Sequence, residues 1–132
     1  MTSAAGGSNT LPQSERLRSR ADFRRVQDRP AIKLQGGTFL VLVGRRQPER
    51  KGRRMGVVAS RKVGNAVARN RAKRLLRALF RLHKDAFPSD VDVVLLALPT
   101  IIGATLGDLE RRLAALRPQL ERANRVAGPA PA

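Results

Sequence analysis

Segment 51–84 constrains the fold more than any other part of this chain, because it combines the pattern of a long helix with charges of a single sign. It holds 12 of the 27 basic residues and no acidic residue. At 100° per residue, apolar side chains gather on one side of a helix expected over about 67–84. They are Ala68, Ala72, Leu75, Leu76, Leu79 and Leu82. This side must be buried against another element of the fold.

The opposite side of the expected helix carries a basic stripe. Its members are Arg69, Lys73, Arg77 and Arg81 at i, i+4 spacing, with Asn70 and Arg74 beside them and Arg71 at the border. Like charges at this spacing destabilise a helix by about 0.2–0.5 kcal/mol per pair, and no acidic residue of the helix offsets them. An ordinary amphipathic helix with solvated charges is the alternative interpretation. The formal net charge of +17 favours an external polyanion instead.

The composition indicates one small domain. A length of 132 residues and a hydrophobic fraction of 42% suffice for a single modest core. Small residues with Pro and Gly dominate segments 1–13 and 127–132, so we expect disordered tails around one domain over residues 14–126. No apolar run approaches the roughly 20 residues of a membrane span, and no export signal precedes the body. With no Cys, disulfides and thiolate metal sites are excluded, and a cytoplasmic protein without a membrane partner is expected.

The sequence of the first half of the chain predicts a helix followed by strands. Ser19 and Asp22 form a capping box that starts a short helix, and Pro30 stops it. Runs rich in β-branched and apolar residues predict strands over 31–34, 38–43, 55–60 and, after the basic helix, 91–98. The last of these is the most apolar run, which predicts a buried strand.

A final helix follows the apolar strand. Thr105 and Asp108 offer a second capping box, and Pro118 is expected to end or kink the helix. Its apolar stripe consists of Leu106, Leu109, Leu113, Leu116 and Leu120. The resulting order, αβββαβα, predicts an α+β fold with the architecture of a small two-layer sandwich.

RNA fits this pattern better than DNA does. Strands are predicted in the middle of the chain, where a helix-turn-helix DNA-binding domain would have helices. The basic face of the helix is also continuous enough to contact the phosphates of a folded RNA. With no Trp, no Tyr and four Phe, an aromatic platform for single strands is disfavoured. Segment 60–65 leads into the N-terminus of the basic helix, where free amides can hold phosphate. Gly64 and Asn65 are equally well explained as a turn and a helix cap.

The sequence offers no convincing catalytic or metal-binding group. A nuclease acting alone needs a general base or carboxylates for Mg²⁺. The single histidine, His83, lies on the apolar side near the end of the basic helix, which predicts a structural role. Asp90 and Asp92 resemble solubilising residues at a strand end. Ion pairing or capping among arginines explains Glu15, Asp22 and Asp28. We therefore predict no catalytic residue and no metal site in the protein.

Two joined motifs resemble the protein component of bacterial ribonuclease P. Residues 69–77 (RNRAKRLLR) match the family's RNRxKRxxR signature, and residues 60–67 (SRKVGNAV) match the stretch before it. Residues 16–26 resemble the family's N-terminal helix, and the similarity spans about 16–120. The resemblance implies the αβββαβα fold with a left-handed βαβ crossover at the basic helix. It also implies a protein that binds ribonuclease P RNA, the catalytic RNA, and assists removal of the 5′ leader from precursor tRNA.

The resemblance further implies which residues bind which RNA. The catalytic RNA would contact Arg69, Asn70, Arg71, Lys73, Arg74 and Arg77, to which the basic stripe adds Arg81. A cleft between the first helix and the sheet would hold the precursor-tRNA leader near Phe23, Leu42, Ser60, Arg61, Lys62 and Asn65. Gln27 and Leu42 replace aromatic residues of the family, so leader stacking is expected to be weaker or shifted. The catalytic Mg²⁺ is expected on the RNA subunit, with none bound by the protein alone and one protein per RNA.

Two other functions fit the composition. A ribosomal-protein-like RNA binder or RNA chaperone would have a similar size and charge, and the intact motif over 60–77 is what favours the ribonuclease P subunit. An autonomous endonuclease is disfavoured because the general base and metal ligands that it needs are missing.

Overall fold

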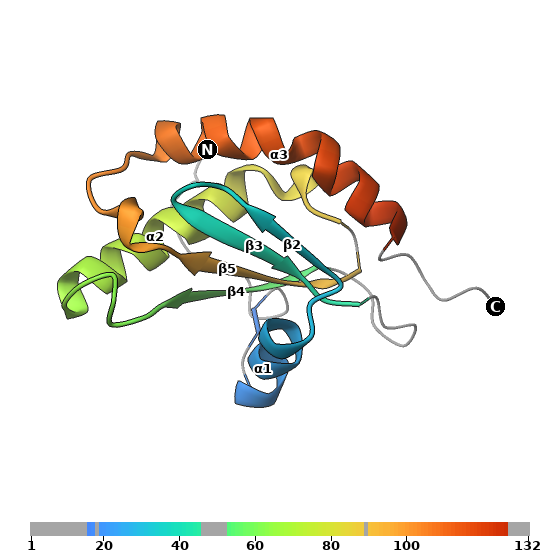
Figure 1. Ribbon diagram of the computed structural model, residues 1–132, viewed down its shortest axis with the longest axis horizontal. Coiled ribbons are helices and arrows are strands. Elements are labelled where there is room, and N and C mark those ends of the chain that lie inside the picture. Colours follow the sequence, from blue (N-terminus) through green and yellow to red (C-terminus); the bar gives the residue numbers. More distant parts are fainter. Residues whose placement is uncertain (1–15, 18, 46–52, 89, 127–132) are drawn as a thin grey trace, which may run out of the picture.

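Figure 1 shows a sheet flanked by helices in the computed structural model, which describes residues 16–17, 19–45, 53–88 and 90–126. The helices are α1 (Arg20–Asp28), α2 (Ala66–Leu82) and α3 (Leu106–Val126), and the strands are β2 (Ile32–Gln35), β3 (Phe39–Val43), β4 (Arg54–Ala59) and β5 (Asp92–Ala97). Two short 3-10 helices, η3 (Lys84–Ala86) and η4 (Pro99–Ile101), flank β5. The predicted order αβββαβα is confirmed. The predicted tails, 1–13 and 127–132, lie outside the described residues, and the domain limits stay predictions.

The four strands lie in the order β2-β3-β5-β4. β3 is antiparallel to both β2 and β5, whereas β4 runs parallel to β5 and forms an edge of the sheet. Parallel neighbours need a crossover connection, and α2 supplies it between β4 and β5. The left-handedness of this crossover stays a prediction. β5 is buried along almost its whole length, as its apolar run predicts, because both of its faces are covered.

Two hydrophobic clusters attach helices to opposite faces of the sheet. The larger one joins α2 and α3 to one face, and the smaller one holds α1 over Leu42 and Val94 on the other. Alternation along β5 explains this division, because Val93 and Leu95 point into the larger cluster and Val94 points into the smaller. The sheet and the α2–α3 layer form the predicted sandwich, and α1 adds a partial third layer (Figure 1).

Side-chain caps begin all three helices. The Ser19 hydroxyl accepts a hydrogen bond from the backbone amide of Asp22 at 3.0 Å. The Asn65 side chain caps α2 by accepting from a backbone amide at 2.9 Å. Thr105 and Asp108 form the reciprocal capping box of α3, with bonds of 2.9 and 3.1 Å. The helix starts predicted at Ser19 and Thr105 are therefore confirmed, and so is the cap at Asn65.

The buried face of α2 is rotated from the predicted one. Phe80 is completely buried, and its ring centroid lies 5.1 Å from that of Phe87. Leu82, predicted on the apolar side, is 50% exposed. At 100° per residue Leu82 points about 120° away from Leu76, which is fully buried, so its assignment to the buried face was wrong.

Pro118 lies inside α3 and does not end it, because the helix runs on to Val126. A proline in a helix interior removes one backbone hydrogen bond. Leucines on both sides of it, at 113, 116 and 120, are buried against the rest of the core. This packing explains why the helix continues through the proline.

Asp92 was wrongly assigned as a solubilising strand-end residue. It begins β5 and is buried. Its two carboxylate oxygens accept hydrogen bonds from the Nε and Nη2 atoms of Arg54, each at 2.9 Å. The parallel register places these two residues side by side on adjacent strands, a pairing that periodicity along one strand does not reveal.

Candidate nucleic-acid interface

A cleft of about 860 Å³ lies at the β4 edge of the sheet, where α1 and α2 approach from opposite faces. Phe23 from α1 and Leu17 line one side, and residues 55–57 of β4 line the base. Ala78 and three arginines of α2 line the other side, and Arg16 also lines the cleft, so its arginines are Arg16, Arg74, Arg77 and Arg81. None of the described lining residues carries a carboxylate. The cleft therefore combines one aromatic ring with four guanidinium groups of like charge.

The arginines of the cleft repel one another. Burial lowers the pKa of the Arg77 guanidinium, and the positive charges of Arg16 and Arg74 lower it further. An arginine nevertheless keeps its charge at neutral pH. An anion in the cleft relieves this repulsion, and guanidinium groups suit phosphate because they donate paired hydrogen bonds.

Backbone pairing places Arg16 in the cleft. Arg16 forms an isolated parallel bridge with Met55, and the amide of Leu17 donates to the Met55 carbonyl at 2.9 Å. This short pairing covers part of the outer edge of β4. Sequence reasoning missed Arg16 as a site residue, because its position depends on a contact with a strand almost forty residues away in the chain.

A glycine determines where the aromatic ring lies. A Cβ atom built at Gly56 would lie 2.2 Å from Cε1 of Phe23 and 2.4 Å from its Cζ. Only glycine allows the ring to approach the strand this closely. Phe23 is half-buried and lines the cleft, so one part of its ring packs on β4 while the remainder stays accessible.

The cleft lies within a region that matches a known family. The family model described as Ribonuclease P matches residues 11–121. A Desulfovibrio desulfuricans protein named Ribonuclease P protein component is 40% identical over 112 residues, which is 85% of each chain. The chain belongs to this family. A Citrifermentans bemidjiense protein of the same name is 42% identical over 88 residues, covering 66% of this chain and 73% of the relative.

Solved structures of the same family share the fold. The RNase P protein from Thermotoga maritima superposes with a TM-score of 0.66 at 30% identity, covering 82% of this chain and 96% of that one. The Staphylococcus aureus RNase P protein gives a TM-score of 0.67 at 25% identity, covering 86% of this chain and 98% of that one. The resemblance inferred from residues 60–77 is thus confirmed at the level of family and fold.

The residues predicted to dock the catalytic RNA do not share one surface. Arg74, Arg77 and Arg81 line the cleft with Phe23. Arg71 lies on the other flank of α2, in a groove of about 480 Å³ that it shares with residues 101–105. Asn70 is exposed on the helix, and Arg69 and Lys73 are half-buried. The Nε of Arg69 is buried and has no hydrogen-bond partner among the described residues.

The residues predicted to contact the leader are also divided. Phe23 lines the cleft, whereas Ser60, Arg61 and Lys62 are exposed beyond the end of β4 and do not line it. Asn65 is engaged as the cap of α2. Leu42 is only 4% exposed and packs beneath α1 with Leu17, Val26 and Val94. Its side chain has no surface to present to a ligand, so it forms no part of the binding surface proposed below.

His83 and the acidic residues Asp22 and Asp92 have structural partners, whereas the ion pairing expected at Asp28 is not found among the described residues. His83 Nε2 lies 2.7 Å from Glu110 Oε2 and ties the end of α2 to α3. Asp22 and Asp92 both bind Arg54. Within the described ranges, no group of three His, Cys, Asp or Glu side chains is placed to hold a metal ion. None of the helices in the described part of the chain combines the length and apolar character of a membrane span.

Proposed function

We propose that this chain is the protein subunit of ribonuclease P, which binds ribonuclease P RNA and the 5′ leader of precursor tRNA and assists removal of the leader. The observation that carries the proposal is the cleft beside β4, where Phe23 faces Arg74, Arg77 and Arg81 without any carboxylate among the described lining residues. A single strand suits such a cleft, because a base stacks on the ring while phosphates pair with guanidinium groups. Membership of the ribonuclease P protein component family supports the same function.

The two flanks of α2 support contact with more than one RNA segment. Arg74, Arg77 and Arg81 lie in the cleft with Phe23, while Arg71 and the exposed turn at Arg61 and Lys62 lie outside it. We assign the outer residues to the catalytic RNA. The cleft arginines lie where leader phosphates and catalytic-RNA phosphates meet, and they reduce the repulsion between the two RNAs.

The hydrolytic chemistry in this proposal belongs to the RNA subunit, which holds the catalytic Mg²⁺. The acidic side chains nearest the cleft do not suit a Mg²⁺ site, because Asp22 and Asp92 are both paired with Arg54. The protein contributes charge neutralisation and substrate positioning. It therefore lowers the Mg²⁺ concentration that the two RNAs need to associate.

A reconstitution assay tests the proposal. The protein is mixed with a bacterial ribonuclease P RNA and precursor tRNA at low Mg²⁺, and removal of the 5′ leader is measured. We expect cleavage that needs both protein and RNA and that falls when Arg74 and Arg77 are both replaced by Ala. Tight, salt-sensitive RNA binding without any stimulation of cleavage would favour a general RNA binder or chaperone. Cleavage by the protein without RNA would instead indicate an autonomous endonuclease.

A further inference from the structure

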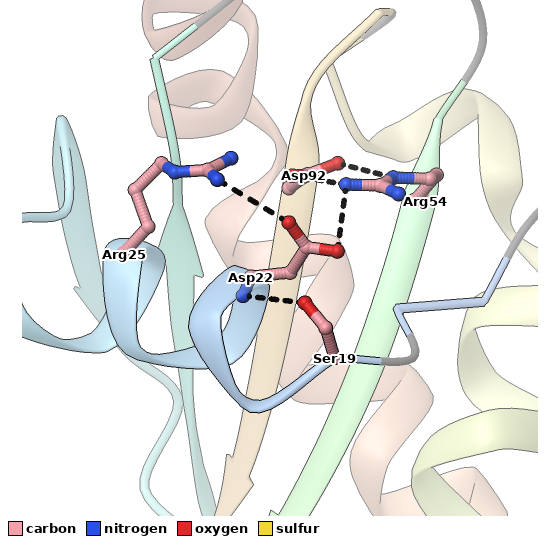
Figure 2. Close-up of polar contacts among 5 residues, drawn as sticks. All are labelled: Ser19, Asp22, Arg25, Arg54 and Asp92. Carbon is pink, nitrogen blue, oxygen red and sulfur yellow. Dashed lines mark hydrogen bonds and ion pairs between the residues drawn. The ribbon is translucent and has the colours of Figure 1, made fainter.

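Arg54 differs from the arginines of the cleft because two carboxylates engage it. Its Nε and Nη2 donate to the two carboxylate oxygens of Asp92, each at 2.9 Å, and Nη2 also lies 3.4 Å from Oδ2 of Asp22 (Figure 2). The other carboxylate oxygen of Asp22 lies 3.4 Å from Arg25. These four side chains, called the Arg54 cluster below, connect the start of β4, the start of β5 and the first turns of α1.

Three of the four side chains of the Arg54 cluster are largely removed from solvent, Arg25 being the exception, and the cluster has no formal net charge. The exposed fractions of the Asp92, Asp22 and Arg54 side chains are 8%, 14% and 20%. Burial raises the pKa of the Asp92 carboxyl, while the hydrogen bond and charge of Arg54 act in the opposite direction. Two arginines and two aspartates cancel, so the cluster attracts phosphate far less than the cleft does. Its geometry instead suits a structural connection between α1 and the sheet.

The attachment of α1 depends on few contacts. It is a helix of nine residues, and isolated helices shorter than roughly 12–15 residues are marginal in water. The small cluster beneath it contains four buried apolar side chains, at Leu17, Val26, Leu42 and Val94. Beside this cluster and the partly buried Phe23 and Val58 packed on it, the ion pair between Asp22 and Arg54 is one of the few contacts that hold α1 in one orientation.

The ion pair and the aromatic ring set the same register between α1 and β4. Asp22 and Phe23 are consecutive on the helix, whereas Arg54 and Gly56 are two apart on the strand and so share one face. Asp22 binds Arg54, and the ring of Phe23 covers Gly56. A shift of α1 that breaks the ion pair must also move the ring off the glycine and change the wall of the cleft.

We propose that Arg54, held by Asp92 and bound to Asp22, is a positioning residue that keeps Phe23 in place as the wall of the leader-binding cleft. This inference rests on the proposed function of the cleft. Arg54 acts through α1 and does not itself contact RNA. The leader is therefore the ligand that depends on the Arg54 cluster, and the catalytic RNA is not.

A matched pair of substitutions on α1 tests this role. Asp22→Asn breaks the ion pair, while Asp28→Asn removes the same charge from an exposed residue that has no ion pair within the described chain. The holoenzyme is reconstituted with ribonuclease P RNA, and its affinity is measured for precursor tRNA and for mature tRNA without a leader. We expect Asp22→Asn to reduce the gain in affinity due to the leader by about fivefold. Asp28→Asn should leave that gain unchanged, and Asp22→Glu should restore most of the loss.

A double-mutant cycle with Phe23→Ala separates positioning from general destabilisation. If the Arg54 cluster acts through the ring, Asp22→Asn causes no further loss in the Phe23→Ala background. Equal losses with and without the ring would overturn the inference, as would an equal loss of affinity for the catalytic RNA. If Phe23→Ala reduced the gain in affinity due to the leader and Asp22→Asn did not, only the positioning role would be overturned. If Phe23→Ala left the gain in affinity due to the leader unchanged, the proposed function of the cleft would be overturned as well.

Discussion

The cleft and the Arg54 cluster use the same side chain in opposite ways. In the cleft, Arg74, Arg77 and Arg81 line one side together, without a carboxylate among the described lining residues. In the cluster, Arg54 is held by Asp22 and Asp92 and is mostly buried. In the proposed function a bound RNA relieves the repulsion in the first region, whereas the charge in the second is already balanced within the protein. An arginine count alone therefore overstates the surface that can bind a polyanion, because an arginine already paired with carboxylates has little charge left to offer.

The largest difference between the two regions is expected in stability. Arg54→Ala leaves the Asp92 carboxylate buried without its partner and should lower the free energy of unfolding by about 3–5 kcal/mol. Arg77→Ala removes a group that is repelled by its neighbours, so the change should stay within about 0.5 kcal/mol. Urea denaturation of both variants measures these values. Similar losses in the two variants would mean that the proposed contrast is wrong.

Gly56→Ala tests the contact where the two regions meet. The added methyl group would lie 2.2 Å from the Phe23 ring, so the ring and α1 must move. Overpacking of this kind costs about 1–3 kcal/mol, and we expect weaker leader binding as well. The control is Gly56→Ala in the Phe23→Ala background, where the clash with the ring is gone and only a 3.2 Å approach to Cδ1 of Leu17 remains. An equal cost in both backgrounds would contradict the close packing of ring and strand.

The salt dependence of RNA binding distinguishes the two kinds of arginine more finely. Replacing Arg74 with Gln removes one phosphate contact and should reduce the slope of log affinity against log salt by about 0.7–0.9. Arg54→Gln removes the charge of a residue that we propose makes no phosphate contact, so it should leave the slope unchanged. Titrations of ribonuclease P RNA at several salt concentrations measure both slopes. A smaller slope for Arg54→Gln would show that Arg54 binds RNA directly.

The smallest expected effect concerns the pH dependence of two aspartates. Hydrogen bonds from Thr105 at the start of α3, followed by the charge of Arg111, hold the pKa of Asp108 below its ordinary value of 3.8. Asp108 therefore stabilises the fold above this value, and the stabilisation is lost as the pH falls through the lowered pKa. Burial shifts the pKa of Asp92 upward, so its contribution changes in the opposite direction and decreases as the pH rises above 3.8.

The free energy of unfolding, measured between about pH 3 and pH 6, shows how the contributions of Asp108 and Asp92 change with pH. Asp108→Asn should flatten the acid side of the stability curve because the titrating cap is gone. An unchanged acid slope in this variant would mean that the capping box of α3 does not contribute through its charge.

Much of the fold follows from local patterns. The helix caps at Ser19 and Thr105 depend on hydrogen bonds that span three residues. The buried strand β5 is recognised from its own short apolar run. The motif over residues 60–77 was sufficient to indicate the family. The assignment of Leu82 to the buried face was wrong, and α3 does not end at Pro118, because packing with other elements decided both outcomes. A kink at Pro118 stays a prediction.

The sequence by itself determined the order of elements, the helix starts and the basic face of α2, because these depend on neighbours along one element. Only the tertiary structure decided the composition of the cleft and of the Arg54 cluster. Arg16 reaches the cleft by pairing with Met55, Phe23 packs on Gly56, and Arg54 meets Asp92 across 38 residues of sequence. Such contacts depend on strand order and on which face of the sheet a helix covers, and neither is encoded in the periodicity of a single segment.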